Sequence, residues 1–319
     1  MELQRTGTRA VPPRVPARLA AALAAVALVA AWRGGAPHAQ VFRSGVDLAS
    51  FGVAVVDKKG GLVTDLTRDD FEVREDGQLQ AVTLFARGDA AEEAAPPLHL
   101  GLLFDTSGSM EESIGFSRSA SIKFLNTVQE AKDITLVDFD TEVRVVRYGQ
   151  HDFPRLVERI RKRKPDGNTA LYDALGVYLD GSSSEEGRRT LVLYTDGGDT
   201  SSVMSYSDAQ TLLRASDITL YAIGFLSHLS QSLQMDQRMK LRTLAELTGG
   251  LAFFPTVIKD LDPTYEKIAA EIRSQFTLGY LSSNTKLDGT WRKVEIKVTR
   301  PGVKVRTRQG YYAPYRKLP

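Results

Sequence analysis

The most constraining feature of the sequence is a regular alternation of strand-like and helix-like segments between about Leu98 and Phe276. The strand-like segments are almost continuously apolar, as in Leu98–Phe104, Ile134–Phe139 and Ile218–Phe225. The segments between them place their apolar residues at helical spacing instead. Continuous apolar strands joined through helices are typical of a mostly parallel sheet that is covered on both faces. We therefore predict a doubly wound α/β domain in this region.

Shorter strands, with polar turns between them, flank this region on both sides. In residues 41–89, Val53–Val56, Phe71–Val73 and Ala81–Phe85 are separated by Asp- and Gly-rich turns. The few alternating strands after residue 276 would make only a thin domain alone. We therefore predict that both flanking segments form one small all-β sandwich, with the α/β domain inserted in it.

The predicted limits of these parts follow from the changes in pattern. Residues 40–96 form the N-terminal β segment and a linker, and residues 97–276 form the α/β domain. Residues 277–319 form the C-terminal β segment, which is expected to pack with residues 40–90.

The first 39 residues predict an export signal. Four arginines precede the 14-residue apolar run Leu19–Trp32, and small residues lead to Ala39. Spanning a bilayer takes about 20 residues, so we favour a signal peptide over residues 1–39, with an N-terminal membrane anchor as the alternative. An exported protein is expected, periplasmic, cell-surface or secreted, with no membrane span after cleavage.

Charge and cysteine content exclude several functions. The net charge is +2, and residues 1–39 hold five arginines and one glutamate, so the remainder carries about −2. A nearly neutral chain argues against a nucleic-acid partner. The basic run from Arg159 to Lys164 is most simply the solvated end of a helix. There is no cysteine, which excludes disulfides and zinc–thiolate sites.

Three segments with oxygen-bearing side chains occur where strand-like or helix-like segments meet loops. Asp105, Ser107 and Ser109 directly follow the first apolar strand of the α/β region, and Asp196 follows the strand over residues 190–194. Thr169 stands just before a helix. Doubly wound folds bind ligands at the carboxyl ends of their strands, so these segments can meet at one site. Their oxygens suit a hard cation such as Mg²⁺.

This constellation resembles the metal-ion-dependent adhesion site of von Willebrand factor A (VWFA) domains. That motif is Asp-x-Ser-x-Ser with a distant Thr and Asp, and all five positions match between about Leu98 and Phe276. The resemblance implies one Mg²⁺, or Mn²⁺ or Ca²⁺, bound directly by Ser107 and Ser109. Thr169 would join directly or through water, while Asp105 and Asp196 would act mainly through water or supporting hydrogen bonds. The sixth position would take a carboxylate of a protein partner, or water.

The flanking segments resemble those of exported bacterial "VWFA-related" proteins of the acidobacterial type. The resemblance rests on five short segments: Val41–Leu48, Leu66–Gly77, Leu278–Tyr280, Trp291–Val294 and Arg308–Tyr312. It covers nearly all of the chain after the predicted signal peptide, and it supports the architecture more than any activity.

Other polar residues are predicted to have simpler roles. Asp199 and Asp173 are possible supplementary ligands, although each is more simply a loop or capping carboxylate. His99, His151 and His228 share no spacing, so each is predicted to be structural or at the surface.

The function predicted from the sequence is a divalent-cation-dependent protein–protein interaction or adhesion module, not an enzyme. The sequence lacks a phosphate loop with lysine, a Gly-x-Ser-x-Gly elbow and a His-Glu-x-x-His motif. Phosphoryl-transfer enzymes of the haloacid-dehalogenase kind need a second carboxylate where this chain has Ser107. The alternatives are a structural subunit of a cell-envelope assembly and, less favoured, a metal-dependent hydrolase. Oligomeric state stays open.

Overall fold

The computed structural model describes residues 48–88, 96–183 and 185–315. The predicted signal peptide, residues 1–39, and most of the linker lie outside these ranges. The described strands form three sheets, one of six strands and two of four. None of the helices in the described ranges is both long enough and apolar enough to span a membrane.

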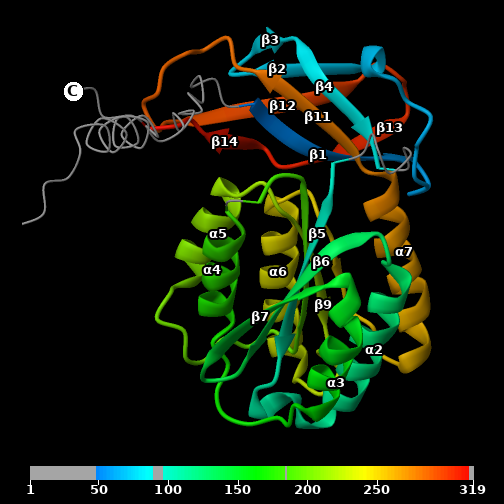
Figure 1. Cartoon of the computed structure of the whole chain (residues 1–319), viewed down its shortest axis with the longest axis vertical. Helices are drawn as coiled ribbons and strands as arrows, with labels where there is room; N and C mark the ends of the chain where they lie inside the picture. The colour runs from blue at the N-terminus through cyan, green and yellow to red at the C-terminus, as the bar shows by residue number, and fades with distance from the viewer. Residues whose placement is uncertain (1–47, 89–95, 184, 316–319) are drawn as a thin grey trace, which may run out of the picture. The chain divides into compact units, whose positions relative to one another are not determined.

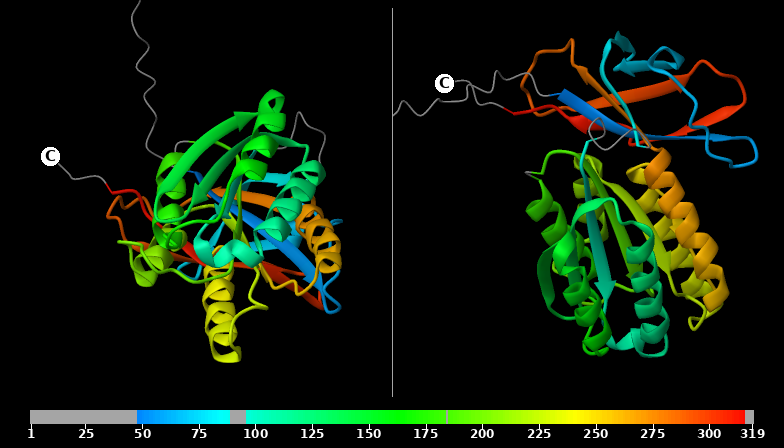
Figure 2. Two further views of the ribbon diagram at one scale, coloured as in Figure 1. Left: turned by 90° about the horizontal axis from the view of Figure 1, so that it is seen from below. Right: turned by 45° about the vertical axis from the view of Figure 1, so that its right-hand side comes forward.

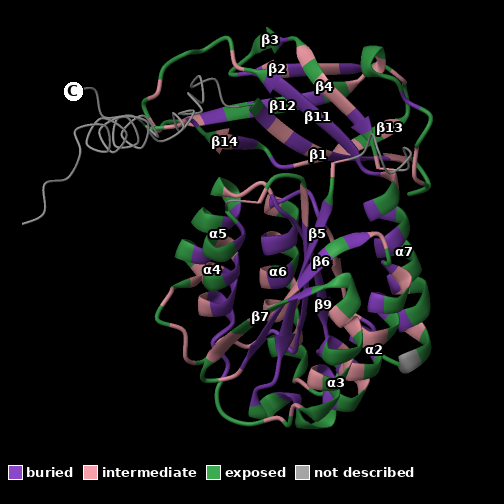
Figure 3. Cartoon of the chain, viewed as in Figure 1, coloured by how far each residue is buried: buried purple, intermediate pink, exposed green. Residues whose placement is uncertain are grey.

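The six-stranded sheet is parallel except at one edge. Its strands in spatial order are β10 (Ala252–Phe253), β9 (Thr219–Gly224), β8 (Arg188–Thr195), β5 (Leu98–Asp105), β6 (Ala131–Phe139) and β7 (Val143–Gly149). β5 pairs in parallel with both β6 and β8, whereas β7 runs antiparallel to β6. All eight residues of β5 are buried, and Figure 3 shows the central strands in the colour of buried residues.

Helices cover both faces of this sheet (Figure 1). One face packs against α2 (Ile114–Thr127), α3 (Phe153–Lys162) and α7 (Leu261–Ser274). The other packs against α4 (Leu171–Ser182), α5 (Tyr206–Ala215) and α6 (Gln231–Leu247). Side chains of β5 alternate between the two layers, as strand geometry requires, with Leu102 in the first and Leu103 in the second. The predicted doubly wound α/β fold is confirmed.

The two four-stranded sheets are antiparallel and face each other across an apolar core. The first sheet contains, in order, β13 (Val303–Arg306), β1 (Leu48–Asp57), β11 (Phe276–Leu281) and β4 (Val82–Arg87). The second contains β14 (Gly310–Tyr312), β12 (Trp291–Val298), β2 (Phe71–Glu75) and β3 (Gln78–Gln80). Short 3₁₀ turns occur at η1 (Arg68–Asp70), η3 (Gln150–Asp152) and η4 (Ile258–Asp260).

Each of these sheets contains strands from both ends of the described chain. In Figure 2 the blue and cyan strands that precede the α/β domain lie beside the orange and red strands that follow it. Phe51 and Phe276 contribute to the core from the first sheet, and Val73 and Ile296 from the second. The predicted β-sandwich, with the α/β domain inserted in it, is therefore confirmed.

A buried carboxylate connects the two halves of the sandwich. Glu75, at the end of β2, has a side chain that is only 1% exposed. It accepts hydrogen bonds from the hydroxyls of Tyr280 (2.8 Å), Tyr311 (2.8 Å) and Ser282 (2.6 Å). The guanidinium of Arg292, also buried, lies 3.3 Å away. Every donor comes from the C-terminal segment, so Glu75 ties the N-terminal segment to it.

We predict that Glu75→Ala lowers the free energy of unfolding by about 3–5 kcal/mol, because it leaves the buried Arg292 without its counter-charge. The matched control is Glu72→Ala on the same strand, which removes a partly exposed ion pair with Arg74 and should cost less than about 1 kcal/mol. Urea unfolding of both variants measures the difference. Equal losses would contradict a structural role for Glu75.

Candidate metal centre

Three loops meet at the carboxyl ends of the parallel strands. The first follows β5 and contains the 3₁₀ turn η2 (Gly108–Glu112), the second precedes α4, and the third follows β8. The amide of Gly108 donates to the carbonyl of Gly167 (2.9 Å), which joins the first loop to the second. The amide of Thr200 donates to the carbonyl of Thr169 (2.9 Å), which joins the second loop to the third.

Asp105 occupies the tip of β5 and is completely buried. One of its oxygens accepts from the amide (2.9 Å) and the hydroxyl (2.6 Å) of Ser107. The other accepts from the hydroxyl of Thr195 (2.6 Å), so this carboxylate joins the first loop to the third. Sequence reasoning did not select Thr195. The available signal was its position at the end of a parallel strand, immediately before Asp196.

The two serines of the first loop bring their hydroxyls to the same point. The Oγ atoms of Ser107 and Ser109 lie 3.1 Å apart, with Ser107 buried and Ser109 exposed. Thr169 is buried in the second loop, and its amide donates to the hydroxyl of Thr200 (2.9 Å). The first loop thus holds two hydroxyls at the Asp105 carboxylate, and hydrogen bonds to the third loop hold the backbone of Thr169 in place.

Asp196 is the most unusual residue of the group. It is 2% exposed, and its Oδ2 atom is buried without a hydrogen-bond partner. The Nε2 atom of His228 lies 3.7 Å from this oxygen, which is too long for a hydrogen bond. Burying a carboxylate oxygen without a partner is costly, and a bound cation would remove that cost. Because His228 comes from a loop after β9, its place beside Asp196 could not be seen in the sequence.

The pKa of Asp105 reports the same excess of negative charge. Burial, and then the charge of Asp196, raise the pKa of Asp105 to about 7, although hydrogen bonds from Ser107 and Thr195 oppose the shift. Two neighbouring carboxylates in a buried site favour either a proton or a cation between them. The donor set consists of carboxylates and hydroxyls, which fits a hard divalent cation.

The two possible supplementary ligands have other partners. Both carboxylate oxygens of Asp173 accept backbone hydrogen bonds, from Val203 (2.9 Å) and Met204 (2.9 Å). One oxygen of Asp199 accepts from the amide of Tyr172 (3.1 Å) and from the hydroxyl of Ser202 (2.6 Å). Both residues therefore organise the third loop.

The basic run at the end of α3 is not simply a solvated helix end. Asp138 is buried within β6, and its carboxylate pairs with Arg144 (3.0 Å), Arg159 (2.7 Å) and Arg163 (2.5 Å). Two arginines of the run thus neutralise a buried charge. The residues next to them in the sequence do not indicate this pairing.

The fold and the loops define the class of protein. It is a doubly wound α/β domain with oxygen-bearing side chains at the carboxyl ends of its strands. The model of the von Willebrand factor type A domain matches residues 99–266, more than half of the chain. The chain therefore belongs to this family. No curated protein matches it.

Several solved structures are similar to this chain at low identity. A von Willebrand factor type A protein from Catenulispora acidiphila is 13% identical with a TM-score of 0.47, covering 86% of this chain and 75% of that one. The PilB minor pilin from Streptococcus sanguinis is 16% identical with a TM-score of 0.45, covering 56% of this chain and 62% of that one. The chain thus spans less than two thirds of that pilin. The vWF domain of the pilus tip protein Mfa5 from Porphyromonas gingivalis is 12% identical, with a TM-score of 0.46, and the match covers 56% of this chain and 97% of that one.

The raised pKa of Asp105 predicts an unusual pH dependence of stability. In the presence of a chelator, the folded protein holds a proton that the unfolded chain releases above about pH 4. The contribution of Asp105 to the free energy of unfolding is therefore complete below about pH 4 and is lost as the pH rises through about 7. The loss is on the order of 4 kcal/mol. Thermal unfolding at about pH 4 and about pH 8 measures it.

The matched variant is Asp105→Asn, which should remove this part of the pH dependence. Mg²⁺ should stabilise the unmodified protein more at about pH 8 than at about pH 5, because the cation replaces the proton. If Asp105→Asn shows the same dependence on pH as the parent, another group is responsible.

Proposed function

We propose that this chain is an exported protein-interaction module in which one divalent cation, most suitably Mg²⁺, links the strand-end site to a carboxylate of a protein partner. The observation that carries the proposal is the buried, unpartnered oxygen of Asp196 beside a second buried carboxylate, Asp105. A hard cation would balance the negative charge of these two carboxylates.

The hydroxyls of Ser107, Ser109 and Thr169 and the carboxylates of Asp105 and Asp196 would hold the cation. Hydroxyl ligands leave more of its positive charge uncompensated than carboxylate ligands do. An incoming carboxylate from a partner would then be attracted strongly, because most residues of the site are shielded from water and electrostatic attraction is stronger there. Ser109 is exposed, so the side of the site nearest this residue is open to solvent.

Binding is a better proposal than catalysis. Ser107 would be the obvious nucleophile, but it is buried and its hydroxyl donates to Asp105. A nucleophile must be free to attack a substrate, and in the proposed site the Ser107 hydroxyl would instead bind the cation. We propose residues 97–276 as the cation-binding part and residues 1–39 as the export signal.

The first test is calorimetric titration of Mg²⁺ and Mn²⁺ into the protein. We expect one cation per chain, and a loss of affinity of about 10–100-fold or more in Asp105→Ala and in Asp196→Ala. Glu112→Ala is the matched control, since it removes an exposed carboxylate of the first loop and should leave affinity unchanged. Affinity that persists in both aspartate variants would refute the site.

The second test concerns the partner. Affinity capture of cell-envelope proteins is expected to recover a partner in Mg²⁺ that is released by a chelator and absent with Asp105→Ala. A complex that survives both the chelator and the substitution would instead favour a structural subunit of an envelope assembly.

A further inference from the structure

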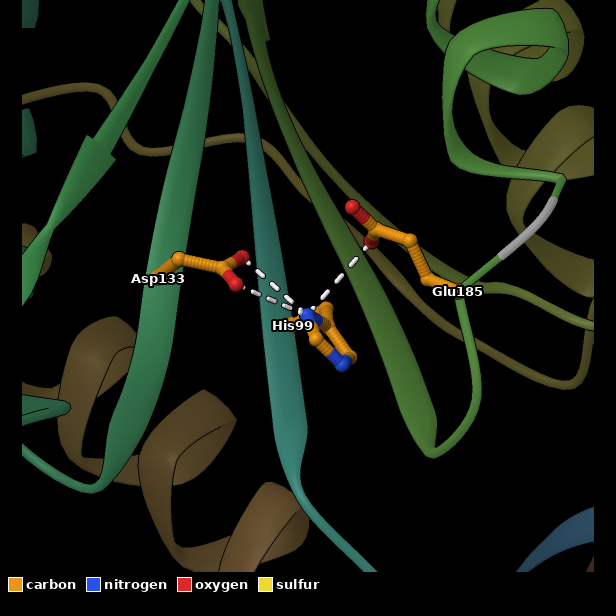
Figure 4. A group of neighbouring side chains, drawn as sticks. All are labelled: His99, Asp133 and Glu185. Atoms are coloured by element: carbon orange, nitrogen blue, oxygen red, sulfur yellow. Dashed lines mark hydrogen bonds and ion pairs between the residues drawn. The ribbon is translucent and has the colours of Figure 1, made fainter. Parts of the chain in front are cut away.

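His99 lies at the start of β5, at the opposite end of the strand from Asp105. The two positions are six residues apart in the sequence, which corresponds to about 20 Å along an extended strand. The residue is buried, with 4% exposed. Figure 4 shows the side chains of Asp133, from β6, and Glu185, from the loop before β8, pointing toward the same ring nitrogen.

The three side chains are close enough to surround one ion. The Nδ1 atom of His99 lies 3.0 and 3.1 Å from the two oxygens of Asp133, and 3.5 Å from Oε2 of Glu185. One ligand atom from each residue lies within 4.8 Å of the other two. The carboxylates are nearly as buried as the ring, with side chains about a tenth exposed.

The other ring nitrogen fixes the chemistry of this cluster. Nε2 of His99 lies 3.2 Å from the carbonyl oxygen of Glu186. A carbonyl can only accept a hydrogen bond, so Nε2 carries a hydrogen. In a neutral ring Nδ1 then holds a lone pair that faces carboxylate oxygens, which is repulsive unless a positive charge intervenes, and Nη2 of Arg147 lies 3.4 Å from this nitrogen. A histidine whose second nitrogen donates to a backbone carbonyl is also the usual arrangement at metal sites.

Arg147 supplies a positive charge in the structure as described. Its Nη2 atom lies 2.6 Å from Asp133, and its Nη1 atom pairs with Glu185. The arginine comes from β7, the antiparallel edge strand of the sheet, and its side chain is 49% exposed. Its long side chain can therefore turn into solvent without opening the core.

We propose that His99, Asp133 and Glu185 form a second divalent-cation site, suited to a borderline metal such as Zn²⁺, for which Arg147 is the built-in competitor. One imidazole nitrogen and two carboxylates are ligands that Zn²⁺ accepts, with water in the remaining position. The oxygen-only site near Asp105 suits Mg²⁺ instead. The proposal does not depend on the function proposed above.

A cation bound here would connect β5, β6 and the loop before β8. Because the three ligands come together only in the folded chain, binding would stabilise the α/β domain by mass action. The two cation sites would then lie at opposite ends of the same buried strand.

The test is calorimetric titration of Zn²⁺ into the full chain with Mg²⁺ in excess, which occupies the oxygen-only site. We expect one Zn²⁺ per chain, with affinity reduced at least about tenfold in His99→Gln and in Glu185→Gln. Arg147→Ala should have the opposite effect and increase affinity, because it removes the competing charge. Zn²⁺ should also raise the thermal unfolding temperature of the unmodified chain but not that of His99→Gln.

Two controls separate this proposal from others. His151→Ala removes an exposed histidine and should leave Zn²⁺ affinity unchanged. Asp105→Ala should weaken Mg²⁺ binding at least about tenfold but keep Zn²⁺ binding, so the two sites can fail independently. A cooperative thermal transition in each variant shows that it is folded.

Several results would overturn the proposal. If no Zn²⁺ binds, a proton on Nδ1 of His99 together with Arg147 is sufficient to balance the negative charge of the two carboxylates. Affinity that is unchanged in both His99→Gln and Glu185→Gln would place the ion elsewhere. Weaker Zn²⁺ binding in Arg147→Ala would also overturn the proposal, because removing a group that competes with the cation should strengthen binding.

Discussion

The complete burial of β5 is the constraint on which the rest of the α/β domain depends. Helices cover both faces of this strand, and parallel neighbours, β6 and β8, pair with both of its edges. Parallel strands end at the same side of a sheet, so the loops after β5 and β8 must meet. That geometry brings Asp105 beside Asp196, although about 90 residues separate them in the sequence.

Buried carboxylates in this protein are compensated in different ways, and the differences distinguish the candidate site. Glu75 is satisfied by three hydroxyls and an arginine, and Asp138 by three arginines. Asp196 retains an oxygen without a partner, and its charge helps to raise the pKa of Asp105. Since an unpaired buried charge costs stability, this oxygen is the observation on which the proposed cation site rests.

Much of the fold could be predicted because hydrophobic periodicity reports burial directly. Leu98–Phe104 was recognisable as a fully buried strand, and the alternating strands on either side were recognisable as a sandwich. The sequence also selected five residues for the candidate site, three from the Asp-x-Ser-x-Ser segment after a strand, and Thr169 and Asp196 from their places at other loops. Their binding of a cation stays a prediction. His228 and the partners of His99 could not, since no local pattern connects them, whereas Thr195 had a signal in its position directly before Asp196.

By itself the sequence determined which segments are strands, which faces are apolar, and which loops carry oxygen-bearing side chains, because these depend on neighbours along the chain. Only the tertiary structure decided which charged groups face one another. It placed Asp133 and Glu185 around His99, and it placed Arg159 of α3 and Arg163, just after that helix, against a buried aspartate of β6. The reason is physical: electrostatic interactions depend on distance through space, and sequence separation does not fix that distance.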